Sequence, residues 1–209
     1  PANWRLPHLW SRVSVTVHPS NAEPGDADLL RRYRAGDAAA FTQLYERHRL
    51  GLFRFLLGLC GDQAVAEEVF QETWMSLIRS ESQQREAAVL FKTWLYQIAR
   101  NRLIDHWRKQ GKRLQREEVF DEQLHDQAMD EPDPERQLSL SQDQARIQAA
   151  LADLPAEQRE VFLMRAHGDL ELHEIAELTR TPAETVKSRL RYALQKMRRL
   201  LSAAEEVAP

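Results

Sequence analysis

The sequence predicts an all-α protein made of two small helical domains joined by a flexible acidic linker. From Asp26 onward, apolar residues recur with helical rather than strand spacing, and Gly-Asp pairs separate the helical runs. The 209 residues, of which 43% are hydrophobic, suit two modest cores better than one large core. Two basic helical segments, Phe91–Arg116 and Thr179–Leu201, flank a proline-marked acidic stretch and indicate where the domains separate.

The net charges of single segments are much larger in magnitude than the formal net charge of −3 of the whole chain. Segment 91–116 has eight basic residues against one acidic residue, a net charge of +7, and segment 117–143 has ten acidic residues against one basic residue, a net charge of −9. This alternation favours selective over indiscriminate binding of a polyanion, because exposed charges interact over only about 8–10 Å. We therefore expect two nucleic-acid-binding modules on a tether that leaves them without a fixed separation.

Composition argues against several classes of protein. Cys60 is the only cysteine, which argues against a disulfide framework or a cysteine metal cluster and favours a reducing compartment, the cytoplasm. No apolar run approaches the roughly 20 residues that span a bilayer. Residues 1–25 lack a continuous apolar core and contain Pro7, Pro19 and Pro24, so we interpret them as a flexible arm or a start-site artefact, with a docked regulatory arm as the alternative.

The first half contains four predicted helical runs. Asp26–Ala35 and Ala38–Leu59 place leucine and aromatic residues on single faces and are expected to build a core. In the third run, one face is apolar and holds Ala66, Val69, Phe70, Thr73, Leu77 and Ile78. The opposite face is acidic and Gln-bearing and holds Glu68, Gln71, Glu72 and Met75. Such a face is ordinarily a solvated surface, and a docking surface for a basic partner is the alternative.

The fourth run, Phe91–Lys109, combines an apolar arc with a polar stripe. The arc holds Phe91, Trp94, Leu95, Ile98 and Ala99. The outward stripe holds Thr93, Gln97, Arg100, Asn101 and Arg108. Arg neutralises phosphates, an Asn amide pairs with a base edge, and rings such as Trp94, Tyr96 and Trp107 stack on unpaired bases for about 1–3 kcal/mol each. The combination favours single-stranded DNA, although core packing is the commoner role of aromatic residues at this spacing.

The second half predicts a helix-turn-helix module. Helical runs are expected at Ser141–Leu154 and Ala156–His167, and a short run, Glu171–Leu178, precedes a long helix that ends at Leu201. A capping box formed by Thr181 and Glu184 predicts that this last helix begins at Pro182.

The outward stripe of the last helix suits the major groove of DNA. It holds Glu184, Lys187, Ser188, Arg191 and Gln195. Lys187 and Arg191 carry the donors that guanine or phosphate requires, and nearby arginines reach backbone phosphates: Arg180, Arg189 and Arg198. A helical hairpin with a solvated basic face is the alternative, but the net charge of +6 over residues 180–199 exceeds what solubility requires.

Three spaced motifs carry a resemblance to a known family. They are Ala66-Glu67-Glu68-Val69-Phe70-Gln71-Glu72-Thr73-Trp74, then Phe91-Lys92-Thr93-Trp94-Leu95-Tyr96-Gln97-Ile98-Ala99-Arg100-Asn101, then Leu154-Pro155 through Thr185-Val186-Lys187-Ser188-Arg189-Leu190. Together they resemble a bacterial extracytoplasmic-function (ECF) sigma factor over residues 26–201. The resemblance implies sigma region 2 at 26–113, a linker at 114–140, sigma region 4 at 141–203 and a tail at 204–209.

The resemblance also implies roles for particular residues. Contacts to a coiled coil of the largest subunit of core RNA polymerase would come from Glu67, Glu68, Gln71 and Glu72. Minus-ten recognition and melting would involve Trp94, Gln97, Arg100, Asn101 and Arg108, with Asn101 lining a pocket for an extruded base. Minus-thirty-five recognition would involve Arg180, Lys187, Ser188, Arg191 and Tyr192. The loop Ser80–Leu90 matches the family's specificity loop. An anti-sigma partner, control by stress and a monomeric free state are further implications.

We expect neither enzymatic activity nor a cofactor or metal ion. The histidines are scattered, with His167 and His173 interpreted as surface residues, and we find no Ser/His/Asp grouping or Gly-rich phosphate loop. A hydrolase or transferase would instead show a pocket with perturbed ionisable groups. Two rivals remain: a stand-alone regulator that binds duplex DNA without polymerase, and a helical decoy that imitates a sigma factor. Tight operator binding by the isolated protein would support the first, and an intact recognition helix argues against the second.

Overall fold

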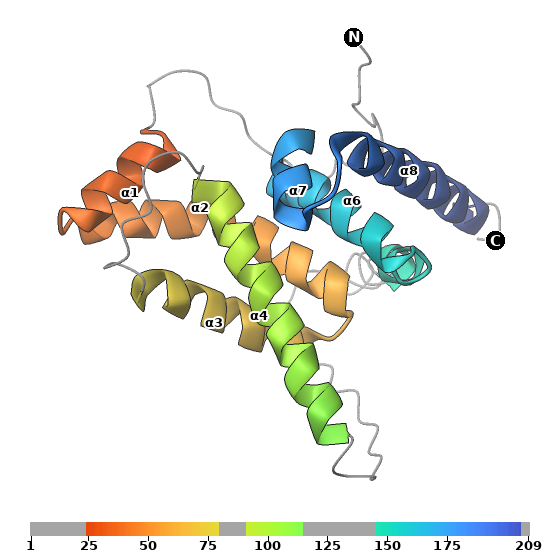
Figure 1. Cartoon of the computed structure of the whole chain (residues 1–209), viewed down its shortest axis with the longest axis horizontal. Helices are drawn as coiled ribbons and strands as arrows, with labels where there is room; N and C mark the ends of the chain where they lie inside the picture. The colour runs from red at the N-terminus through yellow and green to blue at the C-terminus, as the bar shows by residue number, and fades with distance from the viewer. Residues whose placement is uncertain (1–23, 80–90, 115–144, 206–209) are drawn as a thin grey trace, which may run out of the picture.

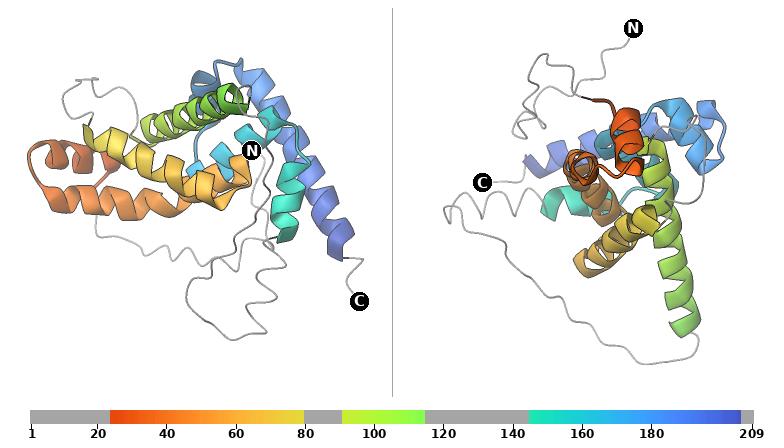
Figure 2. Two further views of the ribbon diagram at one scale, coloured as in Figure 1. Left: turned by 90° about the horizontal axis from the view of Figure 1, so that it is seen from below. Right: turned by 90° about the vertical axis from the view of Figure 1, so that its left-hand side faces the viewer.

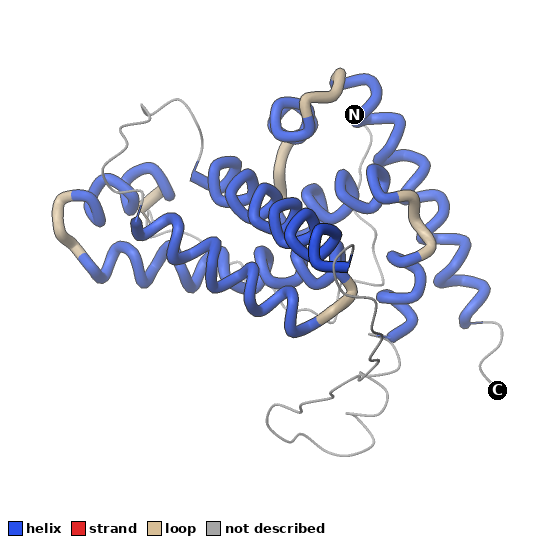
Figure 3. The backbone as a smooth tube through the Cα atoms, turned by 60° about the horizontal axis from the view of Figure 1, so that its bottom comes forward, coloured by secondary structure: helices blue, strands red, loops and turns tan. Residues whose placement is uncertain are grey.

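The computed structural model describes residues 24–79, 91–114 and 145–205. Within these ranges all regular structure is helical, which confirms the predicted fold class (Figure 3). No helix in the described part of the chain is long and apolar enough to cross a membrane. The predicted N-terminal arm, the specificity loop and almost all of the acidic linker lie outside the described residues.

Four helices form the N-terminal domain, with bounds close to the predicted runs: α1 Asp26–Arg34, α2 Ala38–Cys60, α3 Gln63–Arg79 and α4 Phe91–Leu114 (Figure 1). The Asp37 carboxylate accepts hydrogen bonds from two backbone N–H groups and caps α2. Gly61, with a φ of 70°, ends α2 in the left-handed conformation that glycine adopts without strain. The C-terminal end of α4 extends past the neighbouring helices, as Figures 1 and 2 show.

The C-terminal domain begins with helical residues 145–152 and continues with α6 Ala156–Gly168, α7 Leu172–Thr179 and α8 Ala183–Glu205. The last helix starts one residue later than predicted, and the Thr181 hydroxyl donates to the carbonyl of Thr179 instead of capping it. A capping box lies instead at α7, where Glu171 and Glu174 each accept from the other's backbone N–H. The short α7 is thereby fixed at its N-terminus.

The two domains are in direct contact in this structure. Helix α2 packs along α6, and α4 also touches α6 and α7 (Figures 1 and 2). Buried apolar residues of both domains belong to one continuous core, in which Phe55 of α2 and Leu163 of α6 are fully buried. Composition and charge indicated two modules, but they carry no information on whether the modules pack together.

Candidate nucleic-acid interface

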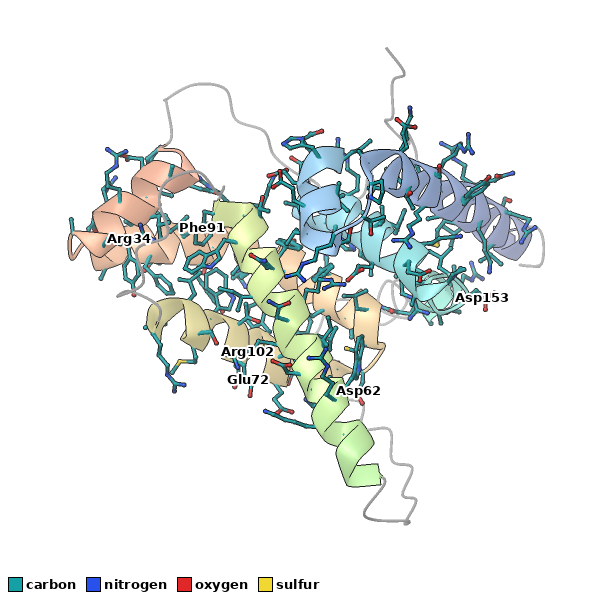
Figure 4. The ribbon with its side chains drawn as sticks, viewed as in Figure 1. Arg34, Asp62, Glu72, Phe91, Arg102 and Asp153 are labelled. Carbon is teal, nitrogen blue, oxygen red and sulfur yellow. The ribbon has the colours of Figure 1, made fainter. Side chains whose placement is uncertain are left out.

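Helix α3 presents the predicted acidic face outward. Glu67, Glu68 and Gln71 are exposed and Glu72 is half-buried. Figure 4 shows Glu72 on α3 beside the middle of α4. Partners within the domain are few: Glu67 accepts a hydrogen bond from Gln63, and a Glu68 carboxylate oxygen lies 3.6 Å from a ring nitrogen of His106. The face therefore offers carboxylate and amide groups to a partner.

The inner side of α3 holds this face rigidly. Val69, Thr73 and Leu77 are buried as predicted, and Trp74 packs its ring edge-on against Tyr45, with ring centroids 4.9 Å apart. A Thr73 hydroxyl buried in this core donates to the carbonyl of Val69 and is thereby satisfied. Interlocked aromatic rings restrict rotation of α3 about its axis, so the acidic side chains keep a fixed direction.

Helix α4 exposes part of the predicted stripe and buries the rest. Asn101 and Arg108 are exposed, while Gln97 and Trp94 are half-buried. One outward prediction is wrong in this structure, because Thr93 is only 7% exposed. Arg100, like Gln97, is half-buried. Tyr96 is 1% exposed, so of its two alternatives it takes core packing and not base stacking. The predicted stripe is therefore only partly available to nucleic acid.

Contacts from the C-terminal domain explain the buried part of α4. The Thr93 hydroxyl donates to a carboxylate oxygen of Glu174 over 2.6 Å, and Nε of Arg100 donates to Glu160 over 2.6 Å. A helical wheel sorts residues by the faces of their own helix, so it identified the stripe correctly as polar. A helical wheel cannot show that a second domain packs on the stripe and forms hydrogen bonds with its polar groups.

Helix α8 presents its predicted outward residues on an open surface. Lys187, Arg191 and Tyr192 are exposed, and Arg180 is exposed in the turn before the helix. The guanidinium of Arg191 lies over the Tyr192 ring, 5.0 Å from its centroid, a cation–π geometry that orients the arginine. Ser188 is half-buried, and its hydroxyl donates to the carbonyl of Glu184 over 2.8 Å. Its oxygen remains able to accept a hydrogen bond.

A groove of about 650 Å³ lies beside the same residues and was not predicted. Its floor is apolar and includes Phe162, Leu190 and Leu194, and its rim includes Lys187, Ser188 and Arg191. Leu190 and Leu194 are half-buried, whereas Val186, Ala193 and Met197 form the buried face of α8. The groove thus places apolar surface next to the basic stripe of α8.

His167 is half-buried rather than exposed, which corrects its interpretation as a surface residue. It lies near the end of α6, and its backbone carbonyl approaches α2 at Gly51. Burial, together with the charge of Arg54, lowers the pKa of His167 from 6.5 to about 4. His173, by contrast, is exposed as expected. A lone histidine gives no sign of its burial when the helix that covers it comes from another domain.

Acidification is expected to destabilise the packing around His167. The unfolded chain takes up this proton near pH 6.5 and the folded chain only near pH 4. The contribution of neutral His167 to the free energy of unfolding is therefore fully present above pH 6.5. As the pH decreases from 6.5 to 4, this contribution falls by about 3 kcal/mol in total. His167→Gln should flatten the dependence of the free energy of unfolding on pH in this window, measured by urea denaturation. An unchanged slope in His167→Gln would contradict the assignment.

The two helical domains match two known sequence families. Residues 44–113 match Sigma-70 region 2, and residues 150–199 match Sigma-70 region 4. The chain is 31% identical over 166 residues to the ECF RNA polymerase sigma factor RpoE of Cereibacter sphaeroides, covering 79% of this chain and 88% of the relative. This chain belongs to the ECF family of RNA polymerase sigma factors. It is also 32% identical over 164 residues to the ECF sigma factor SigL of Mycobacterium tuberculosis, covering 78% of this chain and 90% of SigL.

Solved structures share the fold of this ECF sigma factor. RpoE of Bartonella quintana, solved with the anti-sigma factor NepR, superposes with a TM-score of 0.63 at 24% identity, covering 78% of this chain and 96% of RpoE. CnrH, solved with the cytosolic domain of CnrY, superposes with a TM-score of 0.63 at 21% identity, covering 86% and 99%. The predicted family is confirmed. As a sigma factor, the protein is a transcription initiation factor that acts with core RNA polymerase at promoters, and it is not an enzyme.

Proposed function

We propose that this ECF sigma factor divides promoter recognition among three faces. The acidic face of α3, formed by Glu67, Glu68, Gln71 and Glu72, contacts core polymerase. The face of α4 that holds Trp94, Gln97, Arg100, Asn101 and Arg108 captures the minus-ten strand. Minus-thirty-five recognition falls to Arg180, Lys187, Ser188, Arg191 and Tyr192. One observation carries the proposal: an acidic face and a basic face of opposite character are both exposed on one chain, on different domains. Polymerase would supply catalysis, and this chain the choice of promoter.

The organisation of the chain follows from the same proposal. Region 2 would occupy residues 26–113 and region 4 residues 141–203, joined by the acidic linker 114–140, with an arm at 1–25 and a tail at 204–209. We place the protein in the cytoplasm, where core polymerase is found, and infer that it is monomeric when free. Two structurally similar proteins were solved with protein partners, one of them named an anti-sigma factor, which supports control of this chain by an anti-sigma factor. A response of that control to stress is a further part of the proposal.

Reversing charge on the α3 face is expected to weaken association with core polymerase. Glu67→Lys combined with Glu68→Lys should lower the affinity by about tenfold or more at low salt, because like charges then face the basic partner. Fluorescence anisotropy of labelled protein titrated with sigma-free bacterial core polymerase measures the effect. The control is Glu46→Lys, which changes an exposed acid of α2 that pairs with Arg49. Equal losses in the double variant and the control would reject the assigned docking face.

A further inference from the structure

The turn between α7 and α8 contains an arginine in the left-handed conformation. Arg180 has a φ of 52° and a ψ of 43°. Its backbone N–H donates to the carbonyl of Glu177 over 3.3 Å, and the N–H of Thr181 donates to the carbonyl of Ala176 over 3.0 Å. These two hydrogen bonds form a Schellman motif, which satisfies carbonyl groups at the end of α7 and needs a left-handed residue just after the helix. The turn therefore requires a positive φ at this position.

Arginine is an unfavourable residue at this position. Glycine is the usual residue there because it has no Cβ, whereas the Cβ of any other residue crowds its own backbone when φ is positive. Within the described ranges, Asp169 is the only other non-glycine residue with a positive φ. Aspartate tolerates this conformation better than most residues, and the Asp169 carboxylate lies 3.6 Å from the guanidinium of Arg165. Neither explanation applies to Arg180.

No contact within the described part of the chain offsets the strain at Arg180. Its side chain is exposed, and no ion pair or side-chain hydrogen bond joins it to a described residue. Neighbouring cations differ in this respect. Arg189 is half-buried and donates to the hydroxyl oxygen of Thr181 over 3.4 Å. Lys187 lies 3.6 Å from a carboxylate oxygen of Glu184. Because backbone strain concentrates at functional sites, the guanidinium of Arg180 points to a partner outside the chain.

The place of Arg180 in the fold identifies the chemistry of that partner. The turn joins α7 to the start of α8, whereas Lys187 and Arg191 lie further along α8 on its basic stripe (Figure 1). In a helix-turn-helix, the second helix enters the major groove and the first crosses the DNA backbone, so the turn between them lies close to phosphates. A guanidinium offers a planar fork of donors that matches a phosphate. The contact between Arg189 and Thr181 steadies the backbone from which Arg180 projects.

We propose that Arg180 clamps a backbone phosphate at the edge of the minus-thirty-five element, and that the fold keeps a strained arginine in place of glycine for this contact. The clamp adds affinity for DNA of any sequence, and the choice among sequences stays with the basic stripe of α8. The clamp deepens the proposed function of α8 and rests on it. The strain rests on the backbone geometry alone, so the two parts can fail separately.

Two substitutions at the same position separate strain from charge. Arg180→Ala removes the guanidinium but keeps a Cβ in the left-handed conformation, whereas Arg180→Gly removes both. In thermal unfolding of the full-length protein, Arg180→Gly should melt about 2–4 °C above both the wild type and Arg180→Ala, because only glycine relieves the strain. Arg180→Ala should melt close to the wild type. A melting temperature of Arg180→Gly equal to or below that of Arg180→Ala would overturn the strain.

Binding of promoter DNA tests the clamp. The probe is a fluorescein-labelled duplex of the promoter that directs the protein-dependent transcript, titrated with holoenzyme assembled from this chain and sigma-free core polymerase. Both Arg180 variants should bind about tenfold more weakly at low salt, and the slope of log affinity against log salt should become shallower by about one. The fold-loss should be the same on a duplex with a scrambled minus-thirty-five element. Arg34→Ala, which removes an exposed cation of α1, is the control and should keep the affinity and the slope.

Neutral phosphates locate the contact. Single methylphosphonate substitutions along the duplex should reveal one position that weakens binding of the wild type and leaves binding of Arg180→Gly unchanged. If no position distinguishes the two proteins, or if the loss in the Arg180 variants depends on the minus-thirty-five sequence, the clamp is overturned. Normal binding by the Arg180 variants, with weakened binding when Lys187 and Arg191 are replaced together, would reject the clamp alone. Normal binding by all of these variants would reject the proposed function of α8 as well.

Discussion

Replacing Lys187 and Arg191 together with alanine is expected to lower promoter-specific transcription by about 100-fold or more. Both side chains are exposed on the outward stripe of α8, and Arg191 is oriented by the ring of Tyr192. A well-placed side chain in the major groove is worth about 1–3 kcal/mol of discrimination, and two such contacts at separate positions roughly add. The rate of transcript formation at a defined promoter, with core polymerase in excess, measures the effect.

The control for this double variant removes the same charge elsewhere. Arg31→Ala with Arg34→Ala eliminates two exposed arginines of α1, far from α8 (Figure 1). This control should keep nearly normal transcription, and both double variants should bind core polymerase as the wild type does. If the α1 control lost as much transcription as the α8 variant, the effect would reflect total charge, and the recognition role of α8 would be refuted.

Asn101→Ala is expected to impair promoter opening by about 10–100-fold while leaving polymerase binding nearly unchanged. Asn101 is exposed on α4, so its amide is accessible to a base. Extruding a base costs a few kcal/mol, and hydrogen bonds to the flipped base offset part of that cost. Permanganate reactivity of unpaired thymines in the promoter reports opening, and anisotropy with labelled core polymerase reports binding.

A second amide on the same helix provides the matched control. Gln110 is exposed toward the end of α4 and hydrogen-bonds to His106, so Gln110→Ala removes an amide without touching the proposed pocket. Promoter opening by Gln110→Ala should remain close to that of the wild type. Equal losses of opening and polymerase binding in Asn101→Ala would count against its role in strand capture.

Periodicity was sufficient to predict those helices that have a distinct apolar face. Helix α3 illustrates this: Val69, Thr73 and Leu77 were assigned inward and are buried, and the acidic residues opposite them are at the surface. The Gly-Asp pair at Gly61 likewise marked the end of α2, where a left-handed residue is needed. These features are local, so the sequence alone determines them.

Features that depend on contact between the domains were not predictable in the same way. The burial of Thr93 and the partial burial of His167 require that α6 and α7 lie against the N-terminal domain, and neither residue carries a local signal of that. One signal is present in the sequence: the spacing of Gly51 and Gly58 places them on one helix face. The capping box of Glu171 and Glu174 is not signalled, because a glutamate takes the N-cap position where Ser, Thr, Asp or Asn is usual.

Transcription by sigma-free bacterial core polymerase, with and without this chain, tests the central claim most directly. The templates are genomic fragments that include the region upstream of its own gene. The account predicts at least one discrete transcript that depends on the protein and is lost when Lys187 and Arg191 are replaced together. Tight binding of these fragments by the protein alone, with no transcript when polymerase is present, would contradict the account and indicate a stand-alone regulator.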